Sequence, residues 1–294
     1  MWYAKLPKKG IIHFMIGTYR KLKHLLNKMG STLVAFSGGV DSSVLLAAAH
    51  DALGSRALAA TGLSATFSDY DYQSAQRIAS QIGARWITVK TNELDDPHFS
   101  SNPKNRCYYC KKNLFSLLMR KARQEGLAYV IEGSNTDDLK DHRPGLIATE
   151  EFDVRSPFIE LGIGKEEIRR MAQDRGLENW SRPSSACLSS RIPYGEQITT
   201  HRLNRIAQSE ALLRDMGVRQ VRIRDHGTLA RIELLPEDFV RMLDVEFRDR
   251  VIDGCKAAGY TYITLDLQGY RTGAMNEVLT HEVTILSGET KSAQ

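Results

Sequence analysis

The residues best suited to chemistry stand at positions 37–43, where the sequence reads SGGVDSS. Two glycines open backbone conformations that other residues avoid, and they let an anion approach the chain closely. Serine hydroxyls and the N–H groups of a following helix would then donate to phosphate oxygens. The segment lacks the Gly-Lys-Ser/Thr ending of a Walker A loop and the G-x-G-x-x-G spacing of a dinucleotide fingerprint. It predicts a phosphate-binding loop of another type, the alternative being a glycine turn capped by serine.

Cysteines form the second group with chemical potential. The four are Cys107, Cys110, Cys187 and Cys255. In a cytoplasmic chain thiols stay reduced, so metal binding or catalysis is favoured over a structural disulfide. Cys107 and Cys110 open an expected helix over 107–125, which puts both sulfur atoms on one side. Cys187 lies in a loop of small polar residues near Arg191, whose charge would favour the thiolate. A buried inert cysteine is the alternative.

Arginines alternate with apolar residues in two expected strands, 220–224 and 229–234. Alternation puts Arg222 and Arg224 on one face of the first strand, and it puts Arg231 and Glu233 on one face of the second. If the strands pair, three guanidiniums converge into a site suited to an anion. An ordinary solvated sheet face is the alternative reading of the same pattern.

Composition limits the classes of protein to consider. The chain has 294 residues, 42% hydrophobic and 26% charged, with a formal net charge of +5. Such values indicate a globular protein, and the mild charge suits an anionic small molecule without indicating nucleic acid. No apolar run is long enough to span a bilayer, and the run at 11–16 is too short for a signal peptide. We expect a cytoplasmic protein without a membrane partner.

Strands and helices alternate in the first part of the chain. This alternation predicts βαβ units and an α/β fold, a doubly wound parallel sheet. The expected strands are 31–36, 57–63, 86–89 and 128–131, and the expected helices are 13–29, 42–53, 68–83, 107–125 and 165–175. The region 135–157 shows no regular pattern.

A loop with two prolines and several serines, residues 182–195, suggests a domain boundary. We expect a nucleotide-binding domain over 1–183 and a smaller α+β domain over 184–294, which would carry sulfur transfer and substrate binding. The second domain should contain helices at 199–216 and 237–258, strands at 220–224 and 229–234, and a strand at 260–267.

The phosphate loop, with a strand before it and a helix after it, resembles the PP-loop of the ATP pyrophosphatases. Members of that class cleave ATP between the α and β phosphates, and many adenylate an acceptor. The resemblance implies that pyrophosphate and Mg²⁺ are held by this loop. The residues implied are Ser37, Gly38, Gly39, Asp41, Ser42 and Ser43.

A closer resemblance, nearly end to end, is to the LarE family of ATP-dependent sulfur transferases. It is carried by the segments 141–145 (DHRPG), 186–191 (ACLSSR) and 264–273 (TLDLQGYRTG) and by the arginines of the two strands. The family converts pyridinium-3,5-biscarboxylic acid mononucleotide to its bisthiocarboxylic form, a precursor of the nickel-pincer nucleotide. A homo-oligomer, a hexamer in that family, is implied as well, as is sulfide or another sulfur donor.

The LarE resemblance also assigns roles to residues. Cys187 falls on the sulfur-bearing cysteine, and Lys111 falls on a lysine near the α-phosphate of ATP. Further residues expected to bind the cofactor are Ser64, Gly133, Arg143 and Arg191. The arginines expected to bind the substrate's phosphate are Arg222, Arg224 and Arg231.

The segment 107–110 (CYYC) departs from single-cysteine members, which have tryptophan and alanine at its two ends. It resembles a three-cysteine subgroup, for which a [4Fe-4S] cluster on Cys107, Cys110 and Cys187 is implied as sulfur carrier. Three thiolates can hold a cubane and leave one iron open. A zinc site would need a fourth ligand, and a redox pair usually sits at the first βα junction. In single-cysteine members the cysteine gives up its own sulfur.

Three other functions share part of this pattern. A tRNA thiolation enzyme should carry a strongly basic RNA-binding surface, which a net charge of +5 does not indicate. An amidotransferase-type ligase such as NAD synthetase needs no cysteine triad. A nucleotide-binding or cluster-sensing protein without turnover is distinguished by assaying ATP for conversion to pyrophosphate.

Overall fold

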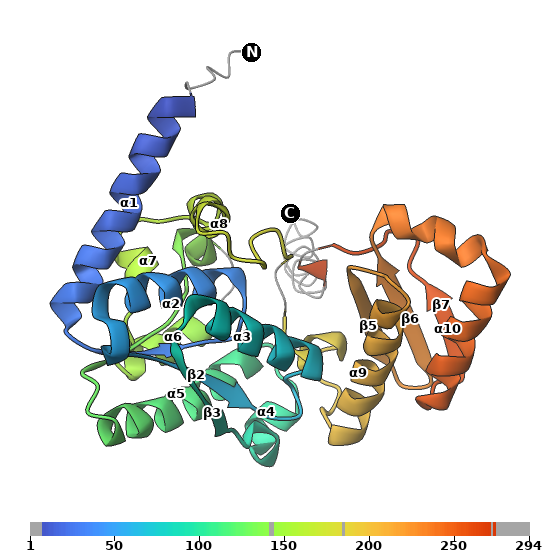
Figure 1. Ribbon diagram of the computed structural model, residues 1–294. Helices are drawn as coiled ribbons and strands as arrows, with labels where there is room; N and C mark the ends of the chain where they lie inside the picture. The colour runs from blue at the N-terminus through green and yellow to red at the C-terminus, as the bar shows by residue number, and fades with distance from the viewer. Residues whose placement is uncertain (1–7, 141–143, 184–185, 272, 275–294) are drawn as a thin grey trace, which may run out of the picture. The chain divides into compact units, whose positions relative to one another are not determined.

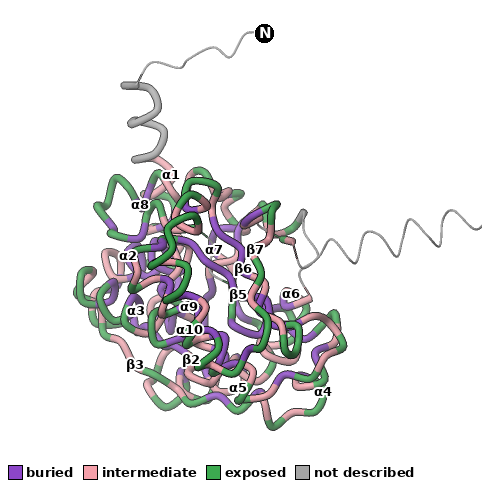
Figure 2. Tube along the Cα trace, turned by 90° about the vertical axis from the view of Figure 1, so that its right-hand side faces the viewer, coloured by how far each residue is buried: buried purple, intermediate pink, exposed green. Residues whose placement is uncertain are grey.

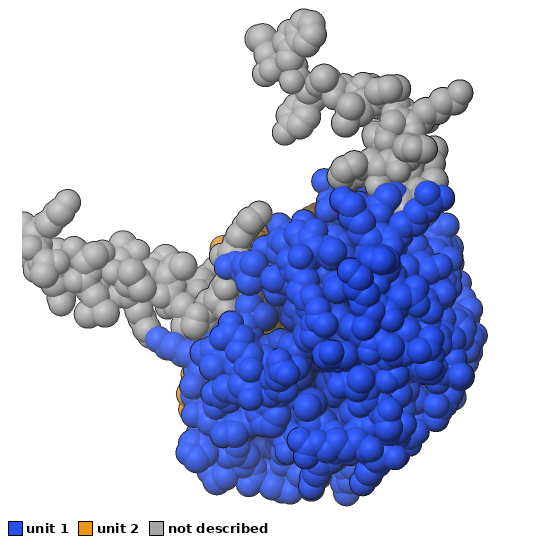
Figure 3. All heavy atoms as spheres, turned by 90° about the vertical axis from the view of Figure 1, so that its left-hand side faces the viewer, with its two compact units in different colours: residues 1–185 blue, residues 186–294 orange. Residues whose placement is uncertain are grey.

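The computed structural model describes residues 8–140, 144–183, 186–271 and 273–274 (Figure 1). The chain divides into two compact units, residues 1–185 and 186–294 (Figure 3). Within the described residues, no helix combines the length and the apolar character that crossing a membrane requires.

A four-stranded sheet forms the centre of the first unit. Its strands are β1 (Thr32–Ala35), β2 (Ala57–Leu63), β3 (Arg85–Lys90) and β4 (Tyr129–Ile131). All pairs are parallel and the order is β3-β2-β1-β4. Between β3 and β4 the chain therefore crosses over β2 and β1 to the other edge of the sheet. The strand order reverses at this point, so a ligand can bind beside the carboxyl ends of β1 and β4.

Helices cover both faces of this sheet. Side chains alternate along each strand, so Val34 and Ala59 pack into the core on one face, whereas Leu33 and Leu58 pack into the core on the other. The first core is completed by α1 (Lys8–Met29), α2 (Val40–Leu53), α3 (Asp69–Ile82), α7 (Pro157–Glu160) and α8 (Lys165–Asp174). The second is covered mainly by α5 (Arg106–Gln124) and α6 (Gly145–Glu151). The predicted α/β doubly wound architecture is confirmed.

Short helices occupy several connections of the first unit. They are η1 (Gly54–Arg56), η2 (Glu93–Asp95), α4 (Pro97–Ser100) and η3 (Thr136–Lys140). The region 135–157, for which we expected no regular structure, contains η3, α6 and the start of α7. Helix α6 is stabilised by packing, since its Ala148 is fully buried in the core that α5 also covers. A seven-residue helix held by tertiary contacts leaves little periodicity in the sequence.

A three-stranded sheet forms the second unit, in the order β5-β6-β7. Its elements are η4 (Leu188–Arg191), α9 (Thr200–Asp215), β5 (Val221–His226), β6 (Leu229–Leu234), η5 (Pro236–Leu243), α10 (Val245–Ala257) and β7 (Tyr262–Leu265). β5 and β6 are antiparallel, and β6 and β7 are parallel. Figure 2 shows that β5 and β6 are mostly buried.

The helix expected over 237–258 is wrong as a single element. It is split at Asp244 into the 3-10 helix η5 and the α-helix α10. The side chain of Asp244 accepts a hydrogen bond from the backbone N–H of Phe247 at 2.7 Å. Asp244 is thus an N-cap that starts a new helix, a signal present in the sequence but hidden by the continuous amphipathic pattern around it.

Candidate functional site

The phosphate loop joins β1 to α2, as the sequence predicts. Gly38 has φ of +72°, and a Cβ at this position would lie 2.8 Å from the Cα atom of Ala75. Another residue would therefore suffer both strain and collision. Gly39 is the N-cap of α2 and, having no side chain, cannot cap the first N–H groups of that helix. These groups and the helix dipole suit the loop to an anion.

Serine side chains of the loop divide into two kinds. Ser42 and Ser43 are buried, and each donates a hydrogen bond to the carbonyl of Gly39, at 3.1 and 2.8 Å. They shape the loop. Ser37 is exposed, and its Oγ lies 3.2 Å from that of Ser42. Of the three hydroxyls, that of Ser37 is the most accessible to a ligand.

Asn179, which the sequence patterns did not indicate, braces the loop from the end of the first unit. Its Nδ2 donates to the carbonyl of Gly38 and to the Oγ of Ser43, both at 2.9 Å. The partners are separated by more than a hundred residues in the sequence, so no local pattern could have revealed the contact.

Asp41, in the first turn of α2, has one engaged and one unsatisfied oxygen. Its Oδ2 forms an ion pair with Lys165, whereas its Oδ1 is buried without a hydrogen-bond partner among the described residues. Burial raises the pKa of Asp41, and the charge of Lys165 opposes that rise. A divalent cation would satisfy Oδ1. Mg²⁺ fits this position, because it takes one or two carboxylates together with phosphates and water.

Glu132, directly after β4, holds Lys111. Its Oε2 lies 3.2 Å from the Nζ of Lys111 and accepts a hydrogen bond from the Oγ of Ser134 at 2.7 Å. Its Oε1 accepts from Ser156 at 2.5 Å. The aliphatic part of Lys111 passes over Gly145, where a Cβ would approach the Cδ of Lys111 to 2.8 Å. These contacts fix the ammonium group at the carboxyl end of β4.

Two further expected residues lie at this edge of the sheet. Gly133 packs against the start of α2, and a Cβ there would lie 3.1 Å from the backbone nitrogen of Ser42. Ser64 follows β2 directly and donates a hydrogen bond of 2.5 Å to Glu93. The carboxyl ends of β1, β2 and β4 thus gather the phosphate loop, Ser64, Lys111 and Gly133. Arg143 lies outside the described residues.

Cys107 and Cys110 lie three positions apart in the first two turns of α5. Cys107 is exposed and Cys110 is half-buried. Cys187, which is also exposed, belongs to the second unit. Cys255 is fully buried in α10, and burial raises the pKa of its thiol. Among the described residues, no group of three or more His, Cys, Asp or Glu side chains is placed to hold a metal ion.

Arg191 anchors the loop that carries Cys187. It is 2% exposed, and it donates to both oxygens of Glu210 at 2.8 and 3.0 Å. Its Nη1 also donates to the carbonyls of Ala186 and Cys187, at 2.5 and 2.8 Å. These contacts position the backbone of Cys187, and the cofactor-binding role expected for Arg191 stays a prediction.

Glu210 is the centre of this buried network. Arg214 donates to it at 2.6 Å, and the backbone N–H of Ile223 donates at 3.2 Å. Burial alone raises the pKa of Glu210, but the charges of Arg191, Arg214 and Arg222 outweigh burial and lower it to about 2. The carboxylate therefore stays ionised and holds the guanidiniums together.

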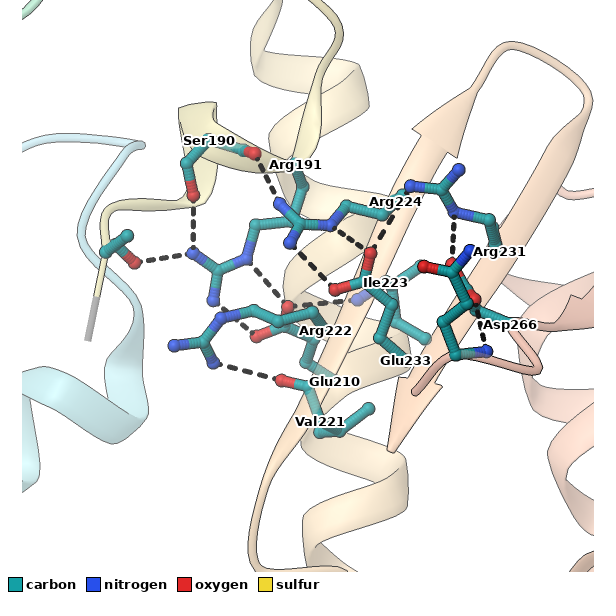
Figure 4. Close-up of polar contacts among 12 residues, drawn as sticks. Ser190, Arg191, Glu210, Val221, Arg222, Ile223, Arg224, Arg231, Glu233 and Asp266 are labelled. Atoms are coloured by element: carbon teal, nitrogen blue, oxygen red, sulfur yellow. Dashed lines mark hydrogen bonds and ion pairs between the residues drawn. The ribbon is translucent and has the colours of Figure 1, made fainter. Parts of the chain in front are cut away.

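The three strand arginines occupy the two paired strands as expected, with Arg224 directly opposite Arg231. Arg224 is buried and donates to both oxygens of Glu233, at 2.8 and 2.7 Å. Arg231 is more accessible and pairs with Glu233 and Asp266, each at 3.3 Å (Figure 4).

Arg222 differs from the other two strand arginines in its surroundings. It is buried and lies 5.4 Å from the ring centroid of Tyr270. Burial, with the charge of Arg191, lowers the pKa of Arg222 to about 10. The carboxylates that engage this network were not anticipated, although Glu233 was visible on the same face as Arg231.

Comparison with known proteins gives the family. The NAD synthase family model matches residues 18–124. An uncharacterised protein of Synechocystis sp. is 42% identical over 88% of this chain and 97% of its own length. The pyridinium-3,5-bisthiocarboxylic acid mononucleotide synthase of Lactiplantibacillus plantarum is 38% identical over 87% of this chain and 92% of its own length. A tRNA-specific 2-thiouridylase of Desulforamulus reducens is 25% identical over about half of each chain (52% and 53%). The similarity to the two full-length relatives, together with the phosphate loop at the β1–α2 junction, shows that the chain belongs to the LarE family of PP-loop proteins.

Proposed function

We propose that the protein is an ATP-dependent sulfur transferase that acts on pyridinium-3,5-biscarboxylic acid mononucleotide. It would adenylate a carboxylate of this substrate and convert it to the thiocarboxylate, a step toward the nickel-pincer nucleotide. One observation carries the proposal: the PP-loop, Asp41 and Lys111 meet at one sheet edge in a chain similar, over most of its length, to an enzyme named for that product.

Each group at the carboxyl edge of the first sheet would have a role in adenylation. The N–H groups of the loop and of the first turn of α2 would hold the pyrophosphate portion of ATP. Asp41 would bind Mg²⁺ through its Oδ1, which has no hydrogen-bond partner within the part of the chain that the structure describes. Lys111, held by Glu132, would offset negative charge at the α-phosphate while the substrate carboxylate attacks it. Pyrophosphate leaves, and the acyl adenylate is then open to a sulfur nucleophile.

Sulfur delivery requires thiols that solvent and substrate can reach. Cys107, Cys110 and Cys187 have partly or fully exposed side chains, whereas Cys255 is buried. The first three would be the ligands of a [4Fe-4S] cluster, and their donor set fits one because thiolates are its usual ligands. When bound, such a cluster supplies a site for an added sulfide. The protein's part is to present the thiolates and, through Arg191, to fix the backbone of Cys187.

Sacrifice of Cys187 is the alternative route, favoured by its exposed position in a loop whose backbone is firmly held. In that route the sulfur of Cys187 itself passes to the acyl carbon and the residue becomes dehydroalanine. In the cluster route Cys187 keeps its mass, and added sulfide supports repeated turnover. In the sacrificial route Cys187 loses the mass of hydrogen sulfide, and added sulfide does not restore turnover.

The phosphate of the substrate would bind at the arginines of the second unit. The network combines five guanidiniums with three carboxylates, so positive charge predominates in it; the arginines are Arg191, Arg214, Arg222, Arg224 and Arg231, and the carboxylates are Glu210, Glu233 and Asp266. Arg231, the most exposed of the three strand arginines, would contact the phosphate directly. The hexamer implied by the family stays part of the proposal, and light scattering of the purified protein tests it.

Product analysis tests the proposed reaction class. Incubation with ATP, Mg²⁺, substrate and sulfide should yield AMP and pyrophosphate in equal amounts, as separated and quantified by chromatography, because pyrophosphate leaves on adenylation and AMP leaves when sulfide attacks the acyl adenylate. Formation of ADP and inorganic phosphate would contradict the assignment.

A further inference from the structure

Glu93 is a buried carboxylate that the adenylation scheme leaves without a task. It is 3% exposed and opens η2, which follows β3. Its Oε1 accepts hydrogen bonds from the hydroxyls of Ser64 at 2.5 Å and of Thr66 at 2.8 Å. Its Oε2 is buried without a hydrogen-bond partner among the described residues. A buried carboxylate is costly, so a specific role is expected of it.

Counting protons around Glu93 fixes the direction of each hydrogen bond. The oxygens of Ser64, Thr66 and Glu93 form a triangle, with 2.9 Å between the two hydroxyl oxygens. Each hydroxyl has one proton, and an ionised carboxylate has none. A carboxylate accepts more strongly than a hydroxyl, and both contacts with Glu93 are shorter than the contact between the hydroxyls. Both protons therefore point to Glu93.

Ser64 is left as an acceptor only. One lone pair of its Oγ takes the backbone N–H of Thr66 at 3.1 Å, and the other stays available. Ser64 is half-buried at the carboxyl end of β2, so a ligand can reach it, whereas Thr66 is buried. A group that binds to Ser64 must then be a hydrogen-bond donor. Phosphate oxygens and the 6-oxo group of a purine are acceptors, and Ser64 would reject them.

We propose that Glu93 is a specificity-determining residue: it commits the proton of Ser64 and so selects a nucleoside that offers a hydrogen-bond donor at this point. Adenosine offers two candidates, the 6-amino group of the base and a ribose hydroxyl. The inference rests on the proposed function, in which the nucleotide of ATP binds at this sheet edge. Glu93 acts through Ser64 and is thus a positioning residue.

The test compares nucleotides in the pyrophosphate-release assay. ITP replaces the 6-amino group by an oxo group, while 2′-deoxy-ATP and 3′-deoxy-ATP each remove one ribose hydroxyl. We expect kcat/KM to fall about tenfold or more for the nucleotide that lacks the selected donor, the size of one mismatched hydrogen bond. Which analogue fails identifies the base or the ribose as the donor.

Variants then assign the selectivity to Glu93. Glu93→Gln keeps the shape but adds an NH₂ group that can donate to Ser64 and release its proton, so the discrimination should shrink toward unity. Ser64→Ala should shrink it as well. Thr66→Val is the matched control, because it removes a neighbouring hydroxyl and keeps the bond between Ser64 and Glu93; it should discriminate like the wild type. The effect should lie in KM rather than kcat.

The outcomes separate this inference from the proposed function. If the wild type forms no pyrophosphate from ATP, the proposed function fails. If it does so but uses all four nucleotides equally, or if Glu93→Gln and Ser64→Ala discriminate like the wild type, the role of Glu93 is refuted and the proposed function stands.

Discussion

The buried carboxylate of Glu210 makes a quantitative prediction about acid stability. Its pKa is lowered from an ordinary value of 4.5 to about 2 in the folded protein. A shift of one pKa unit corresponds to about 1.4 kcal/mol, so ionisation of Glu210 contributes about 3 kcal/mol to the free energy of unfolding. Because the folded-state pKa is depressed, this contribution is complete above about pH 4.5 and is lost as the pH falls toward 2.

Glu210→Gln removes this contribution and leaves Arg191 buried without its carboxylate. At neutral pH the free energy of unfolding should fall by about 3–5 kcal/mol, the usual cost of breaking a buried ion pair. Below pH 4.5 the variant should lose less stability than the wild type per unit of pH. Calorimetric unfolding of the full chain between pH 7 and pH 2 measures both quantities.

Glu246→Gln, an exposed carboxylate in the first turn of α10, is the control and should follow the wild type. Loss of Glu210 should also release Arg191, and with it the backbone of Cys187. Alkylation of Cys187, followed by peptide mass spectrometry, should accelerate in Glu210→Gln while that of Cys107 is unchanged. A variant with wild-type acid dependence and an unchanged alkylation rate would refute this account of the network.

Three further predictions concern the site. Replacing any one cluster ligand by alanine should abolish iron binding and sulfur transfer but not pyrophosphate release, whereas Cys255→Ala should change neither; metal analysis and product assays after oxygen-free purification check this. The ligands concerned are Cys107, Cys110 and Cys187. Asp41→Asn should raise the Mg²⁺ concentration needed for half-maximal adenylation, and an unchanged Mg²⁺ titration would remove Asp41 from the metal site. Arg231→Ala should raise the KM for the mononucleotide at constant stability, because a charge-assisted bond is worth roughly 1.5–3 kcal/mol. Arg224→Ala should instead destabilise the protein, because it leaves the buried carboxylate of Glu233 without the guanidinium that it pairs with. Equal effects of Arg224→Ala and Arg231→Ala on stability would contradict these separate structural and substrate-binding roles.

Features set by neighbouring residues could be predicted from the sequence. The strand expected over 57–63 has the observed bounds of β2, and the phosphate loop lies where its glycines and serines indicate. Both depend on local chemistry, namely a short run of mostly apolar residues for the strand and the conformations open to glycine for the loop. The split at Asp244 was missed because the amphipathic pattern continues through it.

Contacts between distant segments could not be predicted from patterns. Lys165 lies 124 residues from Asp41, and Asn179 lies 136 residues from Ser43. Neither partner stands in a recognisable motif. The strand arginines were found by alternation, but their carboxylate partners depend on the antiparallel register and on α9, which packs beside β5. Alternation indicates which side chains of one strand share a face. It does not indicate which charged side chains of neighbouring strands or helices they will contact.

The central claim is that ATP cleavage activates a carboxylate for sulfur transfer. The most direct measurement is mass spectrometry of a single reaction, in which oxygen-free protein is incubated with ATP, Mg²⁺, the biscarboxylic mononucleotide and sulfide. The account predicts AMP, pyrophosphate and a product in which sulfur replaces a carboxylate oxygen, with Cys187 unchanged in mass. Loss of hydrogen sulfide from Cys187 would contradict the cluster route and favour the sacrificial one. Pyrophosphate release without any thiocarboxylate would contradict sulfur transfer itself.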